Sequence, residues 1–383
     1  MKILHTADWH VGKTIARRQR FDEAAAALRQ MVEIAVDEKV DAVLVCGDVY
    51  EHLAPSAEAE SIVYDTLLAL EARKIAVLVI PGNHDAPRRW SAIAPLLSRF
   101  AVHVVPEVTR PDRGGVVEIA SRDGATVAQV AALPWVMPHR IVSHVEMMGL
   151  AEAPNQAFAD EMARLIGALT RGLDPRKCTI FAGHIFVGGA AIGGGERSLT
   201  IGETFAVTAQ ALPQVQYVAL GHVHRPQRVP GSAVPARYSG SLLQLDFGEV
   251  GQDKSVSIVS IEPGRPVEVR EVPITAGRRL VDVAGTLDEL SRHVDTKDAA
   301  YLRVTVKCDG PTPGLADSVR ERLPHAIDIR ADYPRADGAQ SRSVRGMPPR
   351  EQFARYYAGR HGAAADDALL TLFDELLAAE SER

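Results

Sequence analysis

Apolar residues in the first third of the chain gather in short continuous runs that alternate with stretches of helical periodicity. The runs cover residues 3–6, 42–46 and 75–80, and the helical stretches extend from about 22 to 39 and from about 56 to 73. A continuous apolar run indicates a strand that is covered on both faces, and alternation with helices is typical of a parallel sheet. This region therefore predicts an α/β sheet.

The pattern changes beyond about residue 100, where short strand-like runs are separated by turns rich in Gly and Asp. These runs lie at 116–119, 126–130, 237–239, 255–261 and 267–272, and a helical stretch at about 156–171 separates two groups of them. We expect these strands to form a second sheet that packs on the first within one domain.

A break near residues 273–277 marks the start of a smaller α/β unit. Its predicted strands are 280–283, 301–308 and 326–329, and its predicted helices are 286–293 and 314–322. A stretch rich in Gly, Pro, Ser and Arg follows and is typical of a linker. The predicted organisation is a main domain at 1–275, a small α/β domain at 276–333, a linker at 334–347 and a helical segment at 348–383.

The helical segment carries apolar side chains at helical spacing on two short helices. The first helix presents Phe353, Tyr356 and Tyr357, and the second presents Leu369, Leu370, Phe373, Leu376 and Leu377. Residues three and four apart share one helical face, so each set forms a stripe. Two interpretations remain open: the stripes pack on their own domain, or they form a helical hairpin that binds a partner.

Composition narrows the class of protein. The chain has 383 residues and a net charge of −6, and its three cysteines form no closely spaced pair. The absence of a disulfide framework and of any long apolar stretch leads us to expect a cytoplasmic protein that does not enter a membrane. The acidic balance argues against a stand-alone nucleic-acid binder, which normally shows a basic footprint.

The residues that carry chemistry occur in five short motifs, and each motif follows a predicted strand. The motifs read DWH, GD, GNHD, GH and GHVH, and they supply Asp8, His10, Asp48, Asn83, His184, His222 and His224. Ligands of open α/β sheets bind beyond the carboxyl ends of the strands, so motifs far apart in sequence should meet there.

These residue types suit a metal centre. Carboxylate, carboxamide and imidazole ligands fit Mn, Fe or Zn. Seven ligands are too many for one ion and enough for two, with Asp48 as the natural bridging carboxylate. Two ions ~3.5–4 Å apart can clamp a phosphate and stabilise an in-line displacement. Each motif alone has a plainer interpretation, such as a turn or a structural histidine, but all five together favour a binuclear site.

The five motifs resemble those of the calcineurin-like metallophosphoesterase superfamily. This resemblance implies a four-layer α/β/β/α sandwich. It also implies that Asp8, His10 and His224 hold one ion, that Asn83, His184 and His222 hold the other, and that Asp48 bridges them. His84 would contact the phosphate and assist the leaving group, and Asp85 would orient His84 through a hydrogen bond.

Longer stretches are similar to one branch of that superfamily, the SbcD nuclease subunits of bacterial SbcCD complexes. They are MKILHTADWHVGK, VCGDVYEHLAPS, VIPGNHD, LPWVMP, ALGHVHRPQRV and RYSGSLLQLDFGE. The resemblance implies a Mn²⁺-dependent enzyme with 3′-to-5′ double-strand exonuclease and single-strand or hairpin endonuclease activity. Such enzymes act in DNA repair, recombination and replication.

The same resemblance implies partners. The small α/β unit would be a cap that faces DNA, and the C-terminal hairpin would dock on the coiled coil of an SbcC-type ATPase. The chain would form a homodimer within a heterotetramer. Stand-alone phosphodiesterases and nucleotidases need no cap, linker or apolar hairpin, and an inactive scaffold should have lost metal ligands.

One feature departs from the resemblance, and one run of arginines has two open interpretations. Related archaeal and eukaryotic nucleases carry a histidine three residues after the GD motif, where this chain has Glu51, and His52 follows one position later. A run of arginines occupies the small unit, the linker and the first C-terminal helix: Arg320, Arg322, Arg330, Arg335, Arg342, Arg345, Arg350, Arg355 and Arg360. These arginines form either a solvated face or a surface that contacts phosphates.

Overall fold

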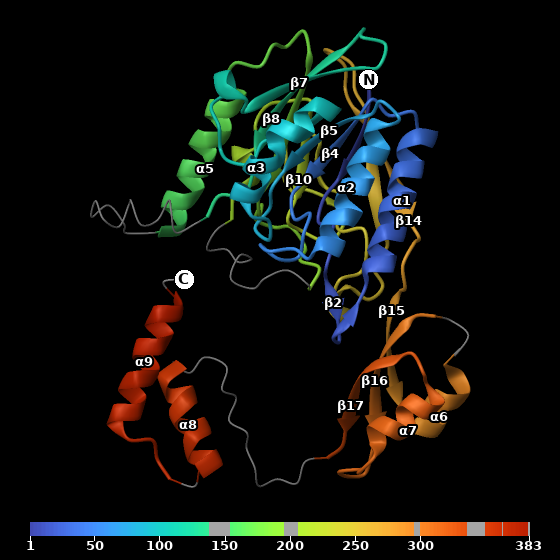
Figure 1. Ribbon diagram of the computed structural model, residues 1–383, viewed down its shortest axis with the longest axis vertical. Helices are drawn as coiled ribbons and strands as arrows, with labels where there is room; N and C mark the ends of the chain where they lie inside the picture. The colour runs from blue at the N-terminus through green and yellow to red at the C-terminus, as the bar shows by residue number, and fades with distance from the viewer. Residues whose placement is uncertain (138–153, 195–205, 295–298, 335–348, 362, 382–383) are drawn as a thin grey trace. The chain divides into compact units, whose positions relative to one another are not determined.

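The chain folds into two compact units. One comprises Met1–Lys307 with Gly314–Ala331, and the other comprises Cys308–Pro313 with Asp332–Arg383. The computed structural model describes residues 1–137, 154–194, 206–294, 299–334, 349–361 and 363–381 (Figure 1). The predicted linker at 334–347 falls almost entirely outside the described residues.

Two six-stranded mixed sheets form the centre of the larger unit. The first has the order β14-β13-β1-β4-β5-β6. Its strands are β1 (Lys2–Thr6), β4 (Ala42–Cys46), β5 (Ala76–Ile80), β6 (Val102–Val104), β13 (Lys254–Ser260) and β14 (Glu268–Ile274). β1, β4, β5 and β6 run parallel to one another, whereas β13 pairs antiparallel with both β1 and β14.

The second sheet has the order β11-β12-β10-β9-β8-β7. Its strands are β7 (Val116–Ala120), β8 (Val127–Leu133), β9 (Cys178–His184), β10 (Tyr217–Gly221), β11 (Gln227–Arg228) and β12 (Ala236–Tyr238). The four central strands β8, β9, β10 and β12 are parallel. Both sheets therefore have parallel strands that end in motif residues.

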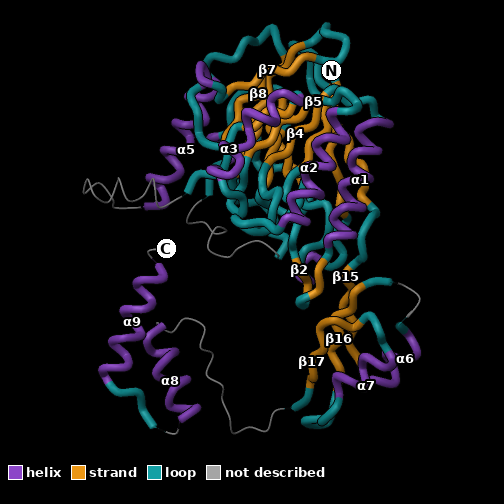
Figure 2. The backbone as a smooth tube through the Cα atoms, viewed as in Figure 1, coloured by secondary structure: helices purple, strands orange, loops and turns teal. Residues whose placement is uncertain are grey.

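Helices cover the outer faces of the sheets, as Figure 2 shows. They are α1 (Phe21–Asp37), α2 (Ala57–Glu71) and α3 (Pro87–Leu97) on the first sheet, and α5 (Pro154–Thr170) on the second. The predicted helices of the main domain are thus confirmed, and Ser56 caps α2 by accepting a hydrogen bond from the Ala59 amide (3.2 Å).

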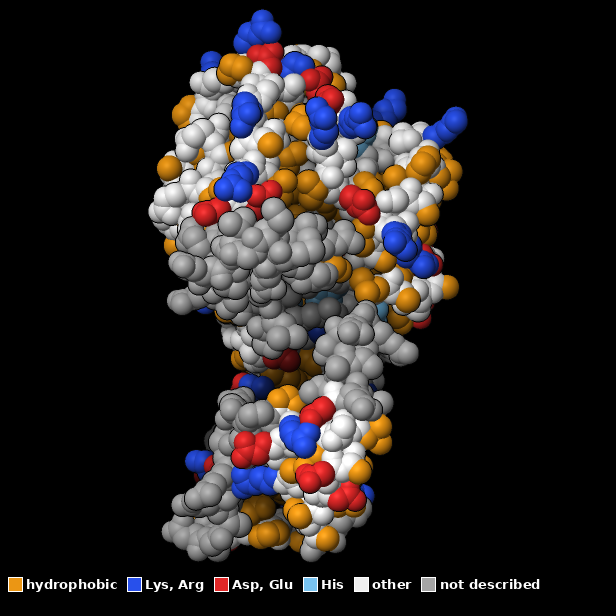
Figure 3. Space-filling view, turned by 90° about the vertical axis from the view of Figure 1, so that its left-hand side faces the viewer, with side chains coloured by type: hydrophobic (Ala, Val, Ile, Leu, Met, Phe, Trp, Pro, Cys, Tyr) orange, Lys and Arg blue, Asp and Glu red, His pale blue; other side chains and the backbone are white. Residues whose placement is uncertain are grey.

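Several charged side chains on the surface form ion pairs. Lys and Arg side chains lie among Asp and Glu side chains on the face drawn in Figure 3. Within the arginine run, Arg320 pairs with Asp317, Arg322 with Asp288 and Arg330 with Asp328. Neighbouring acids thus balance part of the charge of that run.

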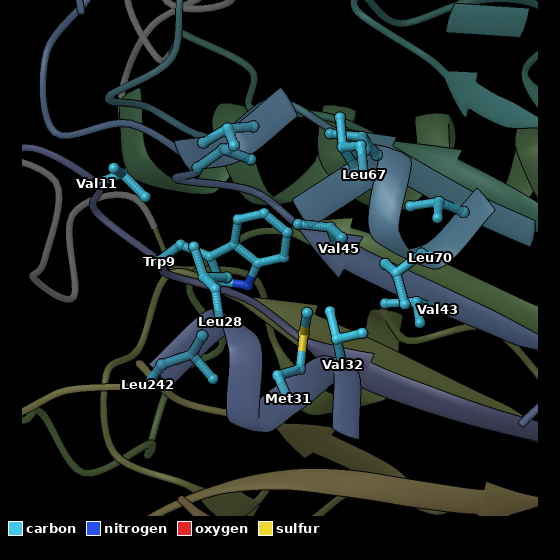
Figure 4. Close-up of a cluster of buried hydrophobic side chains, with 14 of the residues drawn as sticks. Trp9, Val11, Leu28, Met31, Val32, Val43, Val45, Leu67, Leu70 and Leu242 are labelled. Carbon is cyan, nitrogen blue, oxygen red and sulfur yellow. The ribbon is translucent and has the colours of Figure 1, made fainter. Parts of the chain in front are cut away.

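Three apolar cores hold the sheets and helices together. One lies between the first sheet and α1–α3, and Figure 4 shows Leu28 and Met31 of α1 in one cluster with Trp9 and with Val43 and Val45 of β4. A second joins the other sheet to α5. The third lies between the two sheets and contains residues such as Leu44 of one sheet beside residues of the other. Each strand between two cores is buried on both faces, which explains its continuous apolar run.

The last two strands of the main domain join a different sheet from the one we expected. We placed 255–261 and 267–272 in the second sheet, but β13 and β14 extend the first sheet beyond β1. Val256 and Ile258 face the core under the helices, and Val259 faces the core between the sheets. An apolar run shows that both faces of a strand are buried but not which neighbour it pairs with.

The small α/β unit contains a three-stranded sheet and two helices, as predicted. Its elements are β15 (Leu280–Gly285), α6 (Leu287–His293), β16 (Tyr301–Lys307), α7 (Leu315–Arg322) and β17 (Ala326–Asp332). Leu280 and Tyr301 pack against Phe247 and against Ile15 of the hairpin formed by β2 (Thr14–Ile15) and β3 (Arg18–Gln19). The Tyr301 hydroxyl also donates to Glu23 of α1 (3.0 Å).

The second unit contains the two C-terminal helices, α8 (Pro349–His361) and α9 (Asp367–Ser381). The rings of Phe353 and Phe373 stack with centroids 4.4 Å apart and planes 6° apart, and Arg350 pairs with Asp374. The two predicted helices therefore contact each other. Within the described part of the chain, no helix has the length and apolar character needed to cross a bilayer.

Candidate metal centre

The seven predicted ligands meet at the carboxyl ends of five parallel strands. Asp8 and His10 follow β1, Asp48 follows β4, and Asn83 follows β5. His184 ends β9, and His222 and His224 follow β10. Because the two sheets pack face to face, their strand ends deliver these side chains to one buried place.

The clustering falls into two groups that could each hold an ion. Asp8, His10 and His224 place one ligand atom each within 4.8 Å of one another, and so do Asp48, His184 and His222. A third such group contains His10, Asp48 and His84, so Asp48 lies between the two halves of the site. Six of the seven ligand side chains are buried and Asn83 is half-buried, so most of the centre is shielded from bulk water, as two-metal chemistry requires.

The backbone at four of these residues adopts a left-handed conformation. The φ angles are 53° at Asp8, 45° at His10, 50° at Asp48 and 97° at His222. Such conformations cost of order 1–3 kcal/mol each outside glycine and concentrate at functional sites. The surrounding cores therefore hold the ligands in positions that the local chain does not favour.

Two glycines of the motifs allow the strand ends to approach closely. A Cβ atom on Gly47 would lie 2.0 Å from Nδ1 of His184, and one on Gly221 would lie 1.8 Å from the Cys46 carbonyl oxygen. Neither position has room for a side chain. The glycines before Asp48 and His222 are thus required by packing between the sheets as well as by the turn.

Two buried carboxylates fix the rings of His10 and His224. Nδ1 of His10 lies 2.8 Å from Glu51, and Nδ1 of His224 lies 2.9 Å from Glu249. A carboxylate accepts hydrogen bonds, so each Nδ1 carries the proton and each Nε2 carries a lone pair. The two Nε2 atoms face each other at 3.2 Å, an arrangement of two lone pairs that a cation between them would stabilise.

The other half of the site shows the same convergence of lone pairs. Nδ1 of His184 donates to the Cys46 carbonyl (2.8 Å), so Nε2 points into the site and would offer its lone pair to a cation that replaces its proton. That Nε2 lies 3.0 Å from Asn83 Oδ1 and 3.4 Å from Asp48 Oδ2. His222 Nδ1 also lies 2.9 Å from Asn83 Oδ1.

Burial and neighbouring charges shift the pKa values of the ionisable groups of the site in opposite directions. Burial raises the pKa of Asp8 to about 7. Burial also opposes ionisation of Asp48, but the charges of His184 and His10 hold the pKa of Asp48 well below its usual range. Burial lowers the pKa of His10 to about 4, whereas Asp48 outweighs burial at His184 and raises its pKa to about 9. These residues fit a pair of cations, which would replace the protons that Asp8 and His184 otherwise hold.

His84 lies beside this centre, but Asp85 does not orient it as we expected. Nδ1 of His84 instead donates to the backbone carbonyl of Glu51 (2.8 Å). The Asp85 carboxylate accepts from the amides of Gly82, Val49 and Tyr50 at 2.9–3.1 Å. Asp85 therefore joins the loop after β5 to the loop after β4. The prediction was wrong because Asp85 accepts hydrogen bonds from backbone amides, and the spacing of Asp85 and His84 in the sequence gives no information about these donors.

Three residues that contact the ligand histidines were not identified from the sequence. Glu51 and Glu249 support ligand histidines, and Trp135 stacks on His222 with ring centroids 5.1 Å apart. The Trp135 amide donates to the Pro81 carbonyl (3.0 Å), which fixes the tryptophan beside the GNHD loop. The sequence held one indication of their roles. All three lie in the longer stretches that resemble SbcD proteins: Glu51 in GDVYEH, Glu249 in LDFGE and Trp135 in LPWVMP.

The predicted partner-binding residues lie on the two C-terminal helices. Phe353, Leu369, Leu370 and Phe373 are half-buried, and Tyr357 lies near Phe353 with ring centroids 6.2 Å apart. Tyr356 is 61% exposed. The side chains of Leu376 and Leu377 lie outside the described part of the structure.

Known proteins match the chain over its whole length. The calcineurin-like phosphoesterase model matches residues 1–226, and a model described as the type 5 capsule protein repressor C-terminal domain matches residues 276–361. The SbcD subunit of the nuclease SbcCD from Bacillus subtilis is 31% identical over 100% of this chain and 99% of its own length. The chain belongs to the SbcD family of calcineurin-like phosphoesterases.

Two further SbcD relatives agree. The SbcD protein of Rhodobacter capsulatus is 31% identical and covers 85% of each chain. That of Escherichia coli K12 is 28% identical over 81% of this chain and 78% of its own length. Membership of the SbcD family makes the chain a metallophosphoesterase of the nuclease type, with a buried centre of His and Asp residues suited to two metal ions.

Proposed function

We propose that the chain is the nuclease subunit of an SbcCD-type complex and cleaves DNA with two Mn²⁺ ions. The observation that carries the proposal is the convergence of histidine and carboxamide lone pairs with two carboxylates in an SbcD-family chain. Oxygen and imidazole ligands without thiolate suit Mn²⁺. The expected activities are 3′-to-5′ exonuclease on double strands and endonuclease on single strands and hairpins.

In the proposed mechanism the ligands divide into two sets that share Asp48. Asp8, His10 and His224 would hold one ion, and Asn83, His184 and His222 would hold the other. When bound, two such ions would supply Lewis-acid chemistry: they would polarise a phosphodiester and lower the pKa of a water nucleophile. Water adds to phosphorus, and the bond from phosphorus to the leaving oxygen breaks.

His84 is the proposed catalytic residue of the chain itself. Its ring lies 4.6 Å from the ring of His10, centroid to centroid, and its Nδ1–H is tied to the Glu51 carbonyl. This bond holds the imidazole at the edge of the metal centre. We assign His84 to contact the phosphate and to give a proton to the leaving oxygen. Asp85 supports the site by fixing the two loops that carry Asp48 and Asn83.

The remaining parts of the chain serve DNA and a partner in this proposal. Residues 1–275 form the four-layer nuclease domain, 276–333 form a cap that faces DNA, and 334–347 link it to a partner-binding hairpin at 348–383. The curated relatives are named as subunits of SbcCD, which favours an SbcC-type coiled-coil ATPase as the partner. The net charge of −6 supports this division of labour, since the partner would supply part of the DNA-binding surface. We also propose a homodimer of this chain within a heterotetramer.

A nuclease assay tests the proposal. The purified chain is incubated with a hairpin DNA and Mn²⁺, with and without an SbcC-type ATPase and ATP, and Asp48→Asn serves as the inactive control. We expect cleavage of the hairpin that requires Mn²⁺ and is stimulated by the partner with ATP. Hydrolysis of mononucleotides or cyclic nucleotides with no cleavage of DNA would instead identify a stand-alone phosphodiesterase.

A further inference from the structure

The two halves of the metal centre differ in the groups that accept hydrogen bonds from their ligand histidines. In the half formed by Asp8, His10 and His224, both histidines donate Nδ1–H to buried carboxylates, at 2.8 Å from Glu51 and 2.9 Å from Glu249. In the other half, His184 donates its Nδ1–H to the neutral Cys46 carbonyl. The two halves are therefore chemically unequal, although their ligand types are similar.

A lysine holds each of these carboxylates in place. Lys13 Nζ lies 2.9 Å from Glu51 Oε1, and Lys254 Nζ lies 2.7 Å from Glu249 Oε2. Each carboxylate thus binds a histidine with one oxygen and a lysine with the other. Glu249 has no exposed surface and Glu51 is 9% exposed, so the lysines supply the charge that keeps both acids ionised inside the protein.

The carboxylates have further attachments that fix their positions. The Leu245 amide donates to Glu249 Oε2 (3.0 Å), and Lys254 Nζ also donates to the His224 carbonyl (2.9 Å). Glu51 donates its own amide to the Val11 carbonyl (3.2 Å) in the loop that carries His10. Rotation of either imidazole would therefore break several buried hydrogen bonds at once.

We propose that Glu51 and Glu249 are positioning residues that make the Asp8, His10 and His224 site the tighter of the two metal sites. A carboxylate behind a ligand histidine fixes the tautomer with its lone pair toward the ion and increases the basicity of that nitrogen. A neutral carbonyl fixes the tautomer but increases the basicity less. This inference rests on the proposed two-metal function and adds an order of filling to it.

Calorimetric titration of Mn²⁺ into the metal-stripped full-length chain tests the inference. We expect two binding steps in the wild type, and a tighter step that weakens by roughly 10–100-fold in Glu249→Gln and in Glu51→Gln. The weaker step should change little in both variants. Glutamine keeps the size of the side chain and an oxygen acceptor, so the variants remove mainly the charge.

A variant that lacks one ligand shows which of the two sites gives the tighter binding step. Asn83→Ala removes a ligand of the other site, so the step that survives in this variant should be the tight one. Adding Glu249→Gln to Asn83→Ala should then weaken that surviving step. If the surviving step is the weak one, or if the added substitution leaves it unchanged, the inference is wrong.

A matched control separates positioning from general stability. Glu23 forms a similar, partly buried ion pair with Arg20 (2.8 Å) but contacts no ligand histidine. Glu23→Gln should leave both Mn²⁺ steps unchanged. A merely structural role for Glu249 and Glu51 would lower the melting temperature in chelator and leave the Mn²⁺ affinities of the folded protein as they are, which would overturn the inference. Should Glu249→Gln fail to fold, Glu51→Gln decides alone.

Failure of the inference can be told apart from failure of the proposed function. If two Mn²⁺ ions bind and the carboxylate variants weaken both steps equally, the sites are not unequal in the proposed way. The binuclear centre itself would still be supported. A wild-type chain that takes up one ion or none after full loading would refute the binuclear centre itself.

Discussion

The metal centre and the C-terminal helices bury their functional side chains to very different degrees. Asp8 and His184 have no exposed surface, and Asp48 is 2% exposed, because two sheets and three cores enclose them. On the helices, one stacked pair of phenylalanines joins α8 to α9, and Tyr356 remains 61% exposed. The first region is therefore completed by its own chain, whereas the second presents an exposed aromatic side chain that a partner would cover.

The largest expected effect comes from breaking the shared ligand of the metal centre. Asp48→Asn should release metal from both sites and reduce cleavage by more than the roughly 10²–10⁴-fold that a general acid contributes. The reason is that Asp48 groups with His184 and His222 on one side and with His10 and His84 on the other, and its carboxylate also accepts the His84 amide (2.8 Å). Metal analysis after desalting measures occupancy. Full occupancy by two ions would show that Asp48 does not bridge.

A smaller effect is expected for the residue beside the ions. His84→Ala should keep both Mn²⁺ ions and lose about 10²–10⁴-fold in cleavage rate, because a proton donor is lost while the ligands stay in place. Steady-state rates on a single-stranded oligonucleotide, together with metal analysis, check this. His52→Ala is the matched control, since His52 is an exposed histidine of the loop after β4 and should leave the rate unchanged. Equal loss of metal in His84→Ala and Asp48→Asn would contradict the role given to His84.

Removing the helices should leave the first region intact. A chain lacking residues 348–383 should bind two ions, melt at nearly the same temperature and cleave small phosphodiesters at the full rate, because every ligand lies between Asp8 and His224. It should no longer bind an SbcC-type ATPase or degrade duplex DNA with ATP. A pull-down and a thermal melt are the measurements. Collapse of the shortened chain, or partner binding that persists, would place the helices in the core of their own chain.

The smallest effects distinguish the inner from the outer side chains of the helices. Phe373→Ala should weaken the α8–α9 contact by roughly 0.5–1.5 kcal/mol beyond the lost burial, because it removes an aromatic stack. Tyr356→Ala should leave the helices intact and weaken partner binding, since its ring is largely exposed. Circular dichroism and partner affinity, measured on both variants, separate these effects. A Tyr356→Ala variant with unchanged affinity would exclude this ring from the partner surface.

Long-range pairing explains where the sequence interpretation went wrong. β13 follows the second sheet in the chain but pairs with β1, more than 200 residues away, through partners such as Lys2 and Ser260. Asp85 neighbours His84 in sequence but binds the amides of Val49 and Tyr50. In both cases the local sequence predicted the type of segment or side chain, but it did not predict the strand or the amides that it pairs with.

Hydrophobic periodicity and motif spacing predicted most helices and strands of the described regions, though not α3 or β6, and they predicted the seven side chains that meet at the metal centre. They could do so because hydrophobic period reports which faces are buried, and because ligands placed after parallel strands must share one edge of a sheet. The sheet that β13 joins, the backbone partners of Asp85 and the carboxylates that bind His10 and His224 became evident only in the folded molecule. Glu51 lies 41 residues from His10, and Glu249 lies 25 residues from His224. Hydrogen bonds over such separations depend on how the loops pack, and no local periodicity records that packing.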